Sequence, residues 1–168
     1  MLETVCRLDD LEVIKYKPTI LKPFLIDMEP TTVLRRIRFL IDWFYGYSVY
    51  YLKKESVFLG YCTVTSGKNP RFWFSEDCDI VVGPYYIEDK YRGKGYATKL
   101  VNAVITHCEK GWKKAYLYIK NSNQASIKVV EHLGGQFLFH VHNTRTKKLV
   151  KTDSGEYGIY MIRSFSSL

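Results

Sequence analysis

The sequence predicts an α/β (α+β) fold in which strands and helices alternate along one domain. A strand that ends near Ile87 leads through a turn with Gly93 and Gly95 into an amphipathic helix. The segment KAYLYIK, residues 114–120, follows that helix and is rich in strand-forming residues. A strand, a helix and a strand in this order form a right-handed crossover, so the two strands should be parallel neighbours. At 168 residues and 46% hydrophobic composition, the chain is large enough for a core.

One strand and one helix are predicted before residue 47. The strand covers residues 11–16, and prolines make residues 20–28 an irregular or short helical connection. The helix follows Pro30, where Thr31 or Thr32 can cap it, and Gly46 ends it. Its apolar residues recur at helical spacing and are Val33, Leu34, Ile37, Leu40, Ile41 and Phe44.

The aromatic run DWFYGYSVYY, residues 42–51, follows from the end of this helix into the next strand. We favour core packing between helix and sheet. The alternative is the wall of an acceptor site, formed by Trp43, Phe44, Tyr45 or Tyr47.

A hairpin and a long strand come next. Residues 48–53 and 57–65 form the hairpin, in which Gly60 marks a bulge or a close backbone approach. Residues 71–74 could continue the sheet briefly, and residues 76–87 form the long strand. Because proline cannot donate to the ladder, that strand must bulge or lie unpaired at Gly83-Pro84.

The turn after the long strand is suited to phosphate. Gly93 and Gly95 remove side chains that would keep a ligand from the backbone, and the next helix, residues 93–110 with Gly111 as its cap, offers unpaired N–H groups. Thr98 stands where a dinucleotide fingerprint needs glycine, and no P-loop spacing occurs. A solvated Gly-Lys-Gly loop is the alternative.

The last elements are a helix and two strands. The helix starts at residue 123 and stops at Gly134-Gly135. The strands cover residues 136–146 and 156–163, and residues 147–155 form a polar connection between them.

Composition and charge limit the partners. The four cysteines form no Cys-x-x-Cys pair and the four histidines form no ligand pattern with them, so we expect reduced thiols and no metal. No membrane span or secretory leader is predicted, which indicates a cytoplasmic protein. The net charge of +8 could mark a nucleic-acid surface. However, the basic residues are spread along the chain, which disfavours nucleic acid; attraction for an anionic cofactor or substrate explains the charge equally well.

Two motifs carry a family resemblance. Residues 92–97, RGKGYA, fit Arg/Gln-x-x-Gly-x-Gly/Ala, and residues 123–135, NQASIKVVEHLGG, fit Asn-x-x-Ala/Ser-Ile-x-x-x-Glu-x-x-Gly-Phe/Gly. With both motifs in this order, the sequence resembles the GNAT superfamily of acyl-CoA-dependent N-acetyltransferases. The resemblance implies a central, mixed, mostly antiparallel sheet of six to seven strands with a splayed parallel pair and about four helices. It also implies a single domain over residues 1–168, with residues 1–75 on the acceptor side and residues 76–163 as the acetyl-CoA-binding core.

The resemblance also implies the donor site. The backbones of Tyr85 and Ile87 would bind the pantetheine arm, and Asn123 and Ser126 would touch pantetheine or the active centre. The residues expected around the pyrophosphate are Arg92, Gly93, Lys94, Gly95, Tyr96 and Ala97. Each assignment has a plainer alternative, since Arg92 could be an exposed cation, Asn123 a helix cap and Ser126 a first-turn residue.

The chain departs from the family at both proton-transfer positions. Val130 stands where many members carry a tyrosine acid, and Val81 stands where histone-acetylating members carry a glutamate base. Asp79 is the best local carboxylate, because it should share a strand face with Val81, although it could simply be a polar residue at the strand's start. Glu131 and Tyr160 are weaker candidates, and water could relay the proton.

These features predict an N-acetyltransferase that moves an acetyl group from acetyl-CoA to a primary amine. The acceptor could be a small amine, an amino sugar or a protein N-terminus. One alternative is a non-catalytic basic module that binds nucleic acid or regulates a partner on the same fold, and another is a transferase with a different acyl donor. A homodimer is left open.

Overall fold

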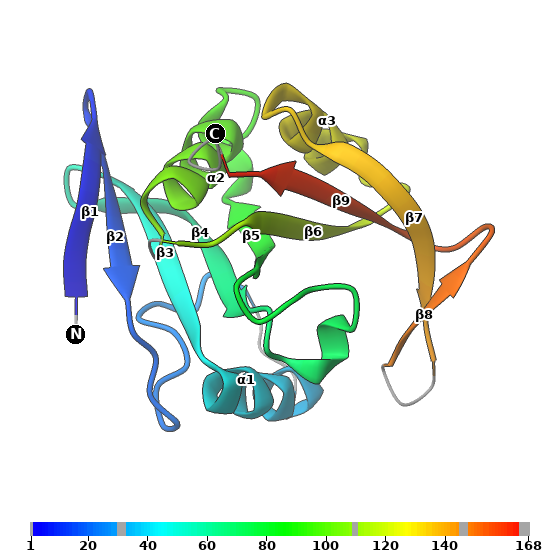
Figure 1. Cartoon of the computed structure of the whole chain (residues 1–168). Helices are drawn as coiled ribbons and strands as arrows, with labels where there is room; N and C mark the ends of the chain where they lie inside the picture. Colours follow the sequence, from blue (N-terminus) through cyan, green and yellow to red (C-terminus); the bar gives the residue numbers. More distant parts are fainter. Residues whose placement is uncertain (1, 30–32, 109–110, 145–147, 165–168) are drawn as a thin grey trace.

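Nine strands pair into one sheet in the computed structural model of this protein, and helices cover both of its faces (Figure 1). The structure describes residues 2–29, 33–108, 111–144 and 148–164. The strands are β1 (Leu2–Leu8), β2 (Leu11–Tyr16), β3 (Tyr47–Lys54), β4 (Val57–Ser66), β5 (Ile80–Ile87), β6 (Lys114–Lys120), β7 (Gln136–Asn143), β8 (Leu149–Thr152) and β9 (Tyr157–Arg163). Within the described residues the helices are α1 (Val33–Tyr45), α2 (Tyr96–His107) and α3 (Gln124–His132), with 3-10 turns η1 (Pro70–Phe72) and η2 (Asp89–Tyr91).

The strand order is β1-β2-β3-β4-β5-β6-β9-β7-β8, and only the β5–β6 pairing is parallel. This confirms the α+β class and the mixed, mostly antiparallel sheet. The sheet is larger than the six to seven strands expected, because β1 and β8 are also strands. Both lie at sheet edges, β1 has no fully buried residue and β8 has only four residues, so neither has a strong hydrophobic alternation.

Three other expectations need correction. Residues 71–74 do not continue the sheet, because Asn69 accepts a hydrogen bond from the Arg71 N–H and starts the 3-10 turn η1. About four helices were expected, but residues 20–28 stay irregular. Helix α2 begins at Tyr96 rather than residue 93, because Gly93 and Gly95 both have positive φ. The end expected for this helix at residues 109–110, and the caps Thr31 and Thr32, lie outside the described residues.

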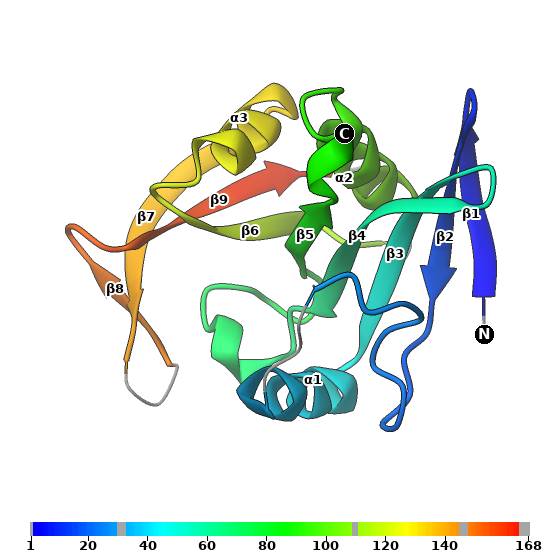
Figure 2. The ribbon, with the colours of Figure 1, turned by 180° about the vertical axis from the view of Figure 1, so that it is seen from behind.

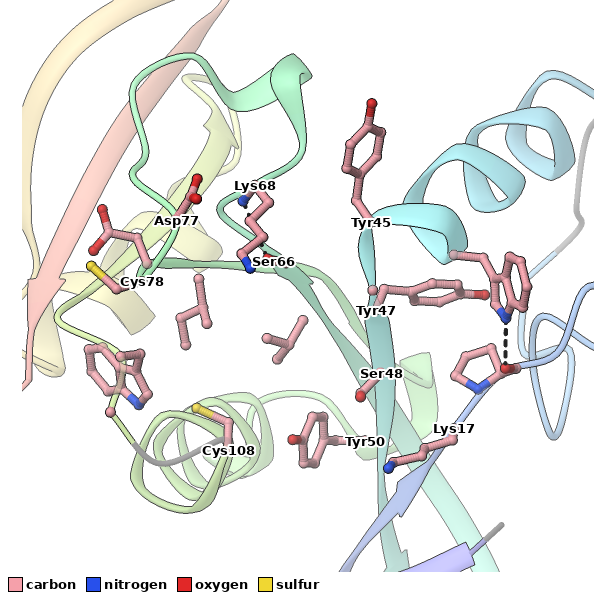
Figure 3. Close-up of a pocket in the computed structure, with 18 residues that line it drawn as sticks. Lys17, Tyr45, Tyr47, Ser48, Tyr50, Ser66, Lys68, Asp77, Cys78 and Cys108 are labelled. Atoms are coloured by element: carbon pink, nitrogen blue, oxygen red, sulfur yellow. Dashed lines mark hydrogen bonds between the residues drawn. The ribbon is translucent and has the colours of Figure 1, made fainter.

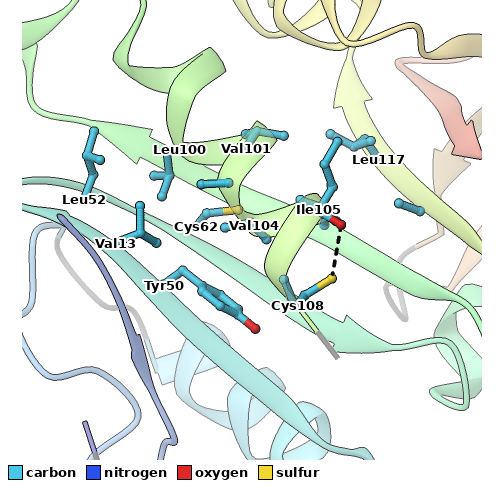
Figure 4. Packing of buried hydrophobic residues seen from close by; sticks show 14 of the residues in the cluster. Val13, Tyr50, Leu52, Cys62, Leu100, Val101, Val104, Ile105, Cys108 and Leu117 are labelled. Atoms are coloured by element: carbon cyan, nitrogen blue, oxygen red, sulfur yellow. Dashed lines mark hydrogen bonds between the residues drawn. The ribbon is translucent and has the colours of Figure 1, made fainter. Parts of the chain in front are cut away.

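Helix α2 packs on one face of the sheet, where most of the core lies (Figure 4). Leu100, Val101 and Val104 are fully buried there against Leu52 and Cys62 from β3 and β4. The four cysteines are free thiols, and none of the described helices is long and apolar enough to cross a membrane.

Gly60 of β4 is the close backbone approach that the sequence indicated. A Cβ atom at this position would collide with the carbonyl oxygen of Tyr86 and the side chain of Ile87 on β5. Glycine therefore lets β4 and β5 lie against each other beside the end of β5.

Helix α1 lies on the opposite side from α2 and α3, near the segment that joins β4 to β5 (Figure 2). It is anchored by Phe39, which is 3% exposed and contacts the rings of Phe24 and Tyr47 at centroid distances of 4.7 and 5.8 Å. Five of the six apolar residues recognised in the sequence face solvent instead, namely Val33, Ile37, Leu40, Ile41 and Phe44, and the side chain of Leu34 lies outside the described residues. The buried side of α1 carries Phe39 and Asp42, three residues apart. The sequence did not indicate this side as the buried one, because the apolar repeat on the other side is longer.

The parallel pair β5–β6 splays after three residues. Ile80, Val81 and Val82 pair with β6, and the ladder between the two strands then ends. A register shift inserts one residue into β5 opposite β4, where Gly83 has a φ of +110° and Pro84 has no N–H to donate. Beyond this bulge, residues 85–87 pair with β4 alone while β6 continues along β9. A wedge therefore opens between the ends of β5 and β6.

We expect Phe39→Ala to lower the free energy of unfolding by about 3–5 kcal/mol, because it removes the ring that holds α1 to the sheet. Ile37→Ala, two residues away on the exposed stripe, should change it by less than about 0.5 kcal/mol. Urea unfolding followed by circular dichroism would measure both. Equal losses for the two variants would mean that α1 packs through the stripe.

Candidate active site

The end of β5 turns two backbone positions into the wedge. The Glu88 N–H donates to the Leu59 carbonyl of β4 at 2.9 Å, so the alternation of an antiparallel strand directs the N–H and C=O groups of Tyr85 and Ile87 away from β4. Consistent with this direction, the Ile87 carbonyl accepts a hydrogen bond from Arg92 Nε at 2.9 Å. Apart from that carbonyl, the wedge therefore offers backbone groups of β5 that an extended ligand arm could pair with.

The glycine turn adjoins the same edge. Gly93 and Gly95 have φ values of +75° and +73°, and Gly95 is the N-cap of α2. A Cβ at either position would meet no atom within 4 Å, so the turn has open space in front of it. Lys94 is exposed, and Tyr96 and Ala97 form the first turn of α2, whose N–H groups have no partner within the helix. The residues present thus fit an anionic group at this helix N-terminus.

Arg92 is engaged beside the turn. Its Nη2 lies 2.9 Å from Asp89 Oδ1, and its guanidinium lies 5.2 Å from the centre of the Tyr86 ring. Both Arg92 and Asp89 are more than half exposed, so this ion pair is readily exchanged for another anion.

Tyr85, Asn123 and Ser126 meet across the wedge. The Tyr85 hydroxyl donates to the Ser126 carbonyl at 3.2 Å, and Asn123 Oδ1 accepts from the Ser126 N–H at 3.1 Å as the N-cap of α3. Burial raises the pKa of Tyr85 to about 12, so its hydroxyl stays a donor at neutral pH. The start of α3 is therefore fastened to the end of β5.

Asp79 lies before β5 rather than on a strand face with Val81. Its two carboxylate oxygens accept hydrogen bonds from the backbone N–H groups of Glu76 and Lys114, at 2.9 and 3.1 Å. These bonds shape the loop that enters β5, which favours the structural alternative for this residue. Among the other candidates, Tyr160 is buried on β9 and Glu131 is exposed on α3.

A small cavity opens on the α1 side of the sheet at the point where β5 and β6 separate. We call it the acceptor pocket, after the role proposed for it below; its volume is about 160 Å³. It is lined by Arg38, Phe39, Asp42, Tyr47, Thr63, Thr65, Arg71, Phe72, Val81, Val82, Gly83, Pro84 and Tyr118. Val81, the position where histone-acetylating GNAT members are expected to carry a glutamate base, thus lines a pocket into which other elements bring polar side chains.

Asp42 is the carboxylate that the sequence analysis missed. It is only 7% exposed, and its Oδ1 accepts a hydrogen bond from Asn69 Nδ2 at 2.8 Å. Burial raises the pKa of this carboxyl, and the nearby charges of Arg38 and Arg71 offset only part of the effect. One signal was available in the sequence, because Asp42 is the single acidic residue of α1.

A larger cavity of about 620 Å³ lies elsewhere, between the C-terminal ends of α1 and α2 (Figure 3). Asp79 and Ile80 line it at the start of β5, so it lies at the opposite end of that strand from the wedge. Residues of the aromatic run, 42–51, border both the acceptor pocket and this larger cavity. Tyr47 is buried and borders both cavities, whereas Trp43 and Tyr45 are exposed and border only the larger of the two. In the described part of the chain, no group of three His, Cys, Asp or Glu residues could hold a metal ion.

Comparison with known proteins agrees with this geometry. Residues 3–136 match the family described as acetyltransferase (GNAT) domain. A ribosomal L7/L12 alpha-N-protein acetyltransferase solved with coenzyme A has a TM-score of 0.64 at 13% identity, covering 96% of this chain and 98% of that chain. The putative acetyltransferase yncA from Salmonella typhimurium, solved with acetyl-CoA, has a TM-score of 0.55 at 18% identity over 83% and 78% of the two chains.

A relative found by sequence matches a smaller part of the chain. The spermine/spermidine N(1)-acetyltransferase of Bacillus subtilis is 29% identical over 86 residues, which are 50% of this chain and 51% of that protein. The match thus spans about half the length of this curated relative.

Asp42→Asn should show the cost of burying the carboxylate. A carboxyl whose folded pKa is raised costs stability once the pH exceeds the unfolded value of about 3.9, and the cost grows until the pH passes the folded pKa. Asparagine stays neutral and keeps an acceptor for Asn69. The stability of the variant relative to wild type should therefore rise between about pH 3.5 and pH 7 in urea unfolding.

Asp10→Asn provides a control of opposite sign. A hydrogen bond from Lys54 lowers the pKa of the exposed Asp10, so its carboxylate contributes stability that is lost as the pH falls. The relative stability of this variant should fall slightly as the pH rises. If the difference in stability between Asp42→Asn and wild type does not change with pH, burial does not raise the pKa of Asp42.

Proposed function

The chain belongs to the GNAT acetyltransferase family, and on this premise we propose that it transfers an acetyl group from acetyl-CoA to a primary amine. The observation that carries the proposal is the continuity of two features, the free backbone edge of β5 and the glycine turn at the start of α2. An extended thiol-bearing arm and a pyrophosphate are the two chemical groups that such a wedge and such a turn accommodate.

In the proposed reaction the amine nitrogen forms a bond with the acetyl carbonyl carbon while the carbon–sulfur bond breaks. The nitrogen gives up one proton and the coenzyme A sulfur ends as a thiol, so an amide and free coenzyme A are the products. The protein has to orient the amine, exclude competing water and hold the proton that leaves the nitrogen.

The residues proposed to bind the donor are those that the sequence predicted. The backbones of Tyr85 and Ile87 would pair with the pantetheine arm, and the N–H groups of residues 93–97 would hold the pyrophosphate. Arg92 would exchange Asp89 for a phosphate oxygen, a stronger and charge-assisted partner. Asn123 and Ser126 would position the arm from the start of α3, through the hydrogen bonds that fasten α3 to Tyr85.

The acceptor amine would enter through the acceptor pocket. Asp42 is the buried carboxylate beside Gly83 and Pro84, and its raised pKa suits a group that takes a proton from an amine. It would replace the base that histone-acetylating members of the family carry at the position of Val81. Asp79, whose oxygens are committed to two backbone N–H groups, is assigned a structural role.

Acetyl-CoA should raise the thermal midpoint of the wild type, and Gly95→Trp should abolish that shift by filling the turn. A ligand at about a hundredfold over its dissociation constant adds roughly 2.7 kcal/mol, which is a shift of a few degrees for a domain of this size. Gly46→Trp is the matched control, because Gly46 also has positive φ and open space but lies at the end of α1. Differential scanning fluorimetry with acetyl-CoA, free coenzyme A and ADP measures all three proteins.

The controls separate the alternatives. No shift for wild type with any of the three ligands would reject the donor site and favour a binding module on this fold. A shift with coenzyme A, but no transfer of acetyl to any amine, would favour another acyl donor.

A further inference from the structure

We infer that the acceptor is a small amine that also carries an anionic group, held by Arg38 and Arg71 while Asp42 receives the amine. The inference deepens the proposed function and rests on it, since it names the substrate class of the same pocket. It is drawn from the arrangement of charge in the acceptor pocket, where two guanidinium groups and one carboxylate line a cavity of about 160 Å³.

Both arginines are half-buried, and among the described residues neither Arg38 nor Arg71 has a carboxylate partner within ion-pair distance. Arg71 has the Tyr118 hydroxyl as a hydrogen-bond partner, makes a long hydrogen bond of 3.5 Å to Asn143 Oδ1 and lies 5.9 Å from the ring of Phe72. Guanidinium groups are planar forks that match carboxylate and phosphate oxygens, so this pair has unused donors for an anion.

The arginines also repel each other in the absence of an anion. Burial and the nearby charge of Arg38 lower the pKa of the Arg71 guanidinium, and Asp42 offsets only part of this effect. An anionic group placed between the two arginines would remove that repulsion at a site where water screens little.

Asp42 supplies the complementary end. Asn69 occupies Oδ1, and within the described residues Oδ2 has no hydrogen-bond partner. An ammonium or amine at Oδ2 would lie in the same small cavity as the two arginines, close to Gly83 and Pro84. A molecule with an amine and an anion only a few bonds apart therefore complements the pocket, as in an α-amino acid or an amino phosphate.

The same charges disfavour a polyamine. Spermine and spermidine carry several cations, and the pocket would place at least one of them near Arg38 or Arg71. The net charge of +8 adds to this repulsion at long range. The polyamines after which the Bacillus subtilis relative is named therefore do not suit this pocket.

The first test compares acetylation within matched pairs, followed by release of the free thiol of coenzyme A. The pairs are an α-amino acid and its amide, and phosphoethanolamine and ethanolamine, with spermidine as the polycation. We expect kcat/KM for the anionic member of at least one pair to exceed that of its neutral partner by about tenfold or more, as a charge-assisted contact gives. The pair with the larger ratio of kcat/KM values shows whether the pocket prefers a carboxylate or a phosphate as the anionic group of the acceptor. Equal values within both pairs, or spermidine as the best acceptor, would overturn the inference.

The second test asks whether the arginines cause the preference. Arg71→Gln should reduce the ratio between the two members of the preferred pair by about 10- to 100-fold, mainly through KM of the anionic member. Arg71→Lys keeps the charge and should retain part of the ratio. Arg7→Gln, at an exposed arginine of β1, is the matched control and should keep the wild-type ratio. An unchanged ratio in Arg71→Gln, with the acetyl-CoA thermal shift intact, would contradict the assignment.

A binding measurement separates this inference from the proposed transfer. The N-acetylated amino acid and its N-acetylated amide are added to the protein with coenzyme A, and the thermal midpoint is recorded. If the N-acetylated amino acid stabilises the protein, its amide does not, and Arg71→Gln removes the effect, the anion site is supported. If no amine is acetylated in that case, only the proposed acetyl transfer is rejected. If amines are acetylated with no preference for the anionic member of a pair, the proposed transfer stands and the anion site is rejected. The anion site is also rejected if the protein neither binds the N-acetylated amino acid nor prefers anionic acceptors.

Discussion

The structure depends on the point where the parallel ladder between β5 and β6 ends. Three residue pairs hold the two strands together, and the bulge at Gly83 and Pro84 then leaves the rest of β5 bound to β4 alone. A sheet normally hides its backbone groups in the ladder, so an unpaired interior edge is costly unless a ligand uses it. The glycine turn, the first turn of α2 and the start of α3 all gather around this edge, and the acceptor pocket opens beside the bulge.

The groups proposed to bind the donor and the acceptor lie on opposite faces of the sheet. On one face, α2 and α3 surround the wedge with backbone groups and a helix N-terminus, which suit a long, flexible and anionic donor. On the other face, α1 and η1 bring charged side chains to a small pocket. Val81 of β5 is apolar, so in the proposed function the charged groups of the pocket come from elements that pack against the sheet.

The residues proposed for the donor could be selected from the sequence because they belong to local motifs. The spacing from Gly93 to Ala97, the cap at Asn123 and the proline at position 84 each determine a backbone geometry within a few residues. Asp42 and Arg71 could not be placed in this way, since they are far apart in the sequence and meet only through tertiary packing. The same limit applies to α1, whose strongest apolar repeat lies on its exposed side, and to the edge strands β1 and β8, which bury too little to show a period.

Gly60 gives the wedge a second, less obvious determinant. Because any side chain at this position would meet the Tyr86 carbonyl and Ile87, a larger residue would push the end of β5 away from β4 and toward β6. If the donor arm lies in the wedge as proposed, the width available to it is set from the other side of β5, where Gly60 has no side chain. In the proposed function, a larger residue at Gly60 would therefore narrow the wedge and change which acyl groups fit there, although Gly60 itself lies on the other side of β5.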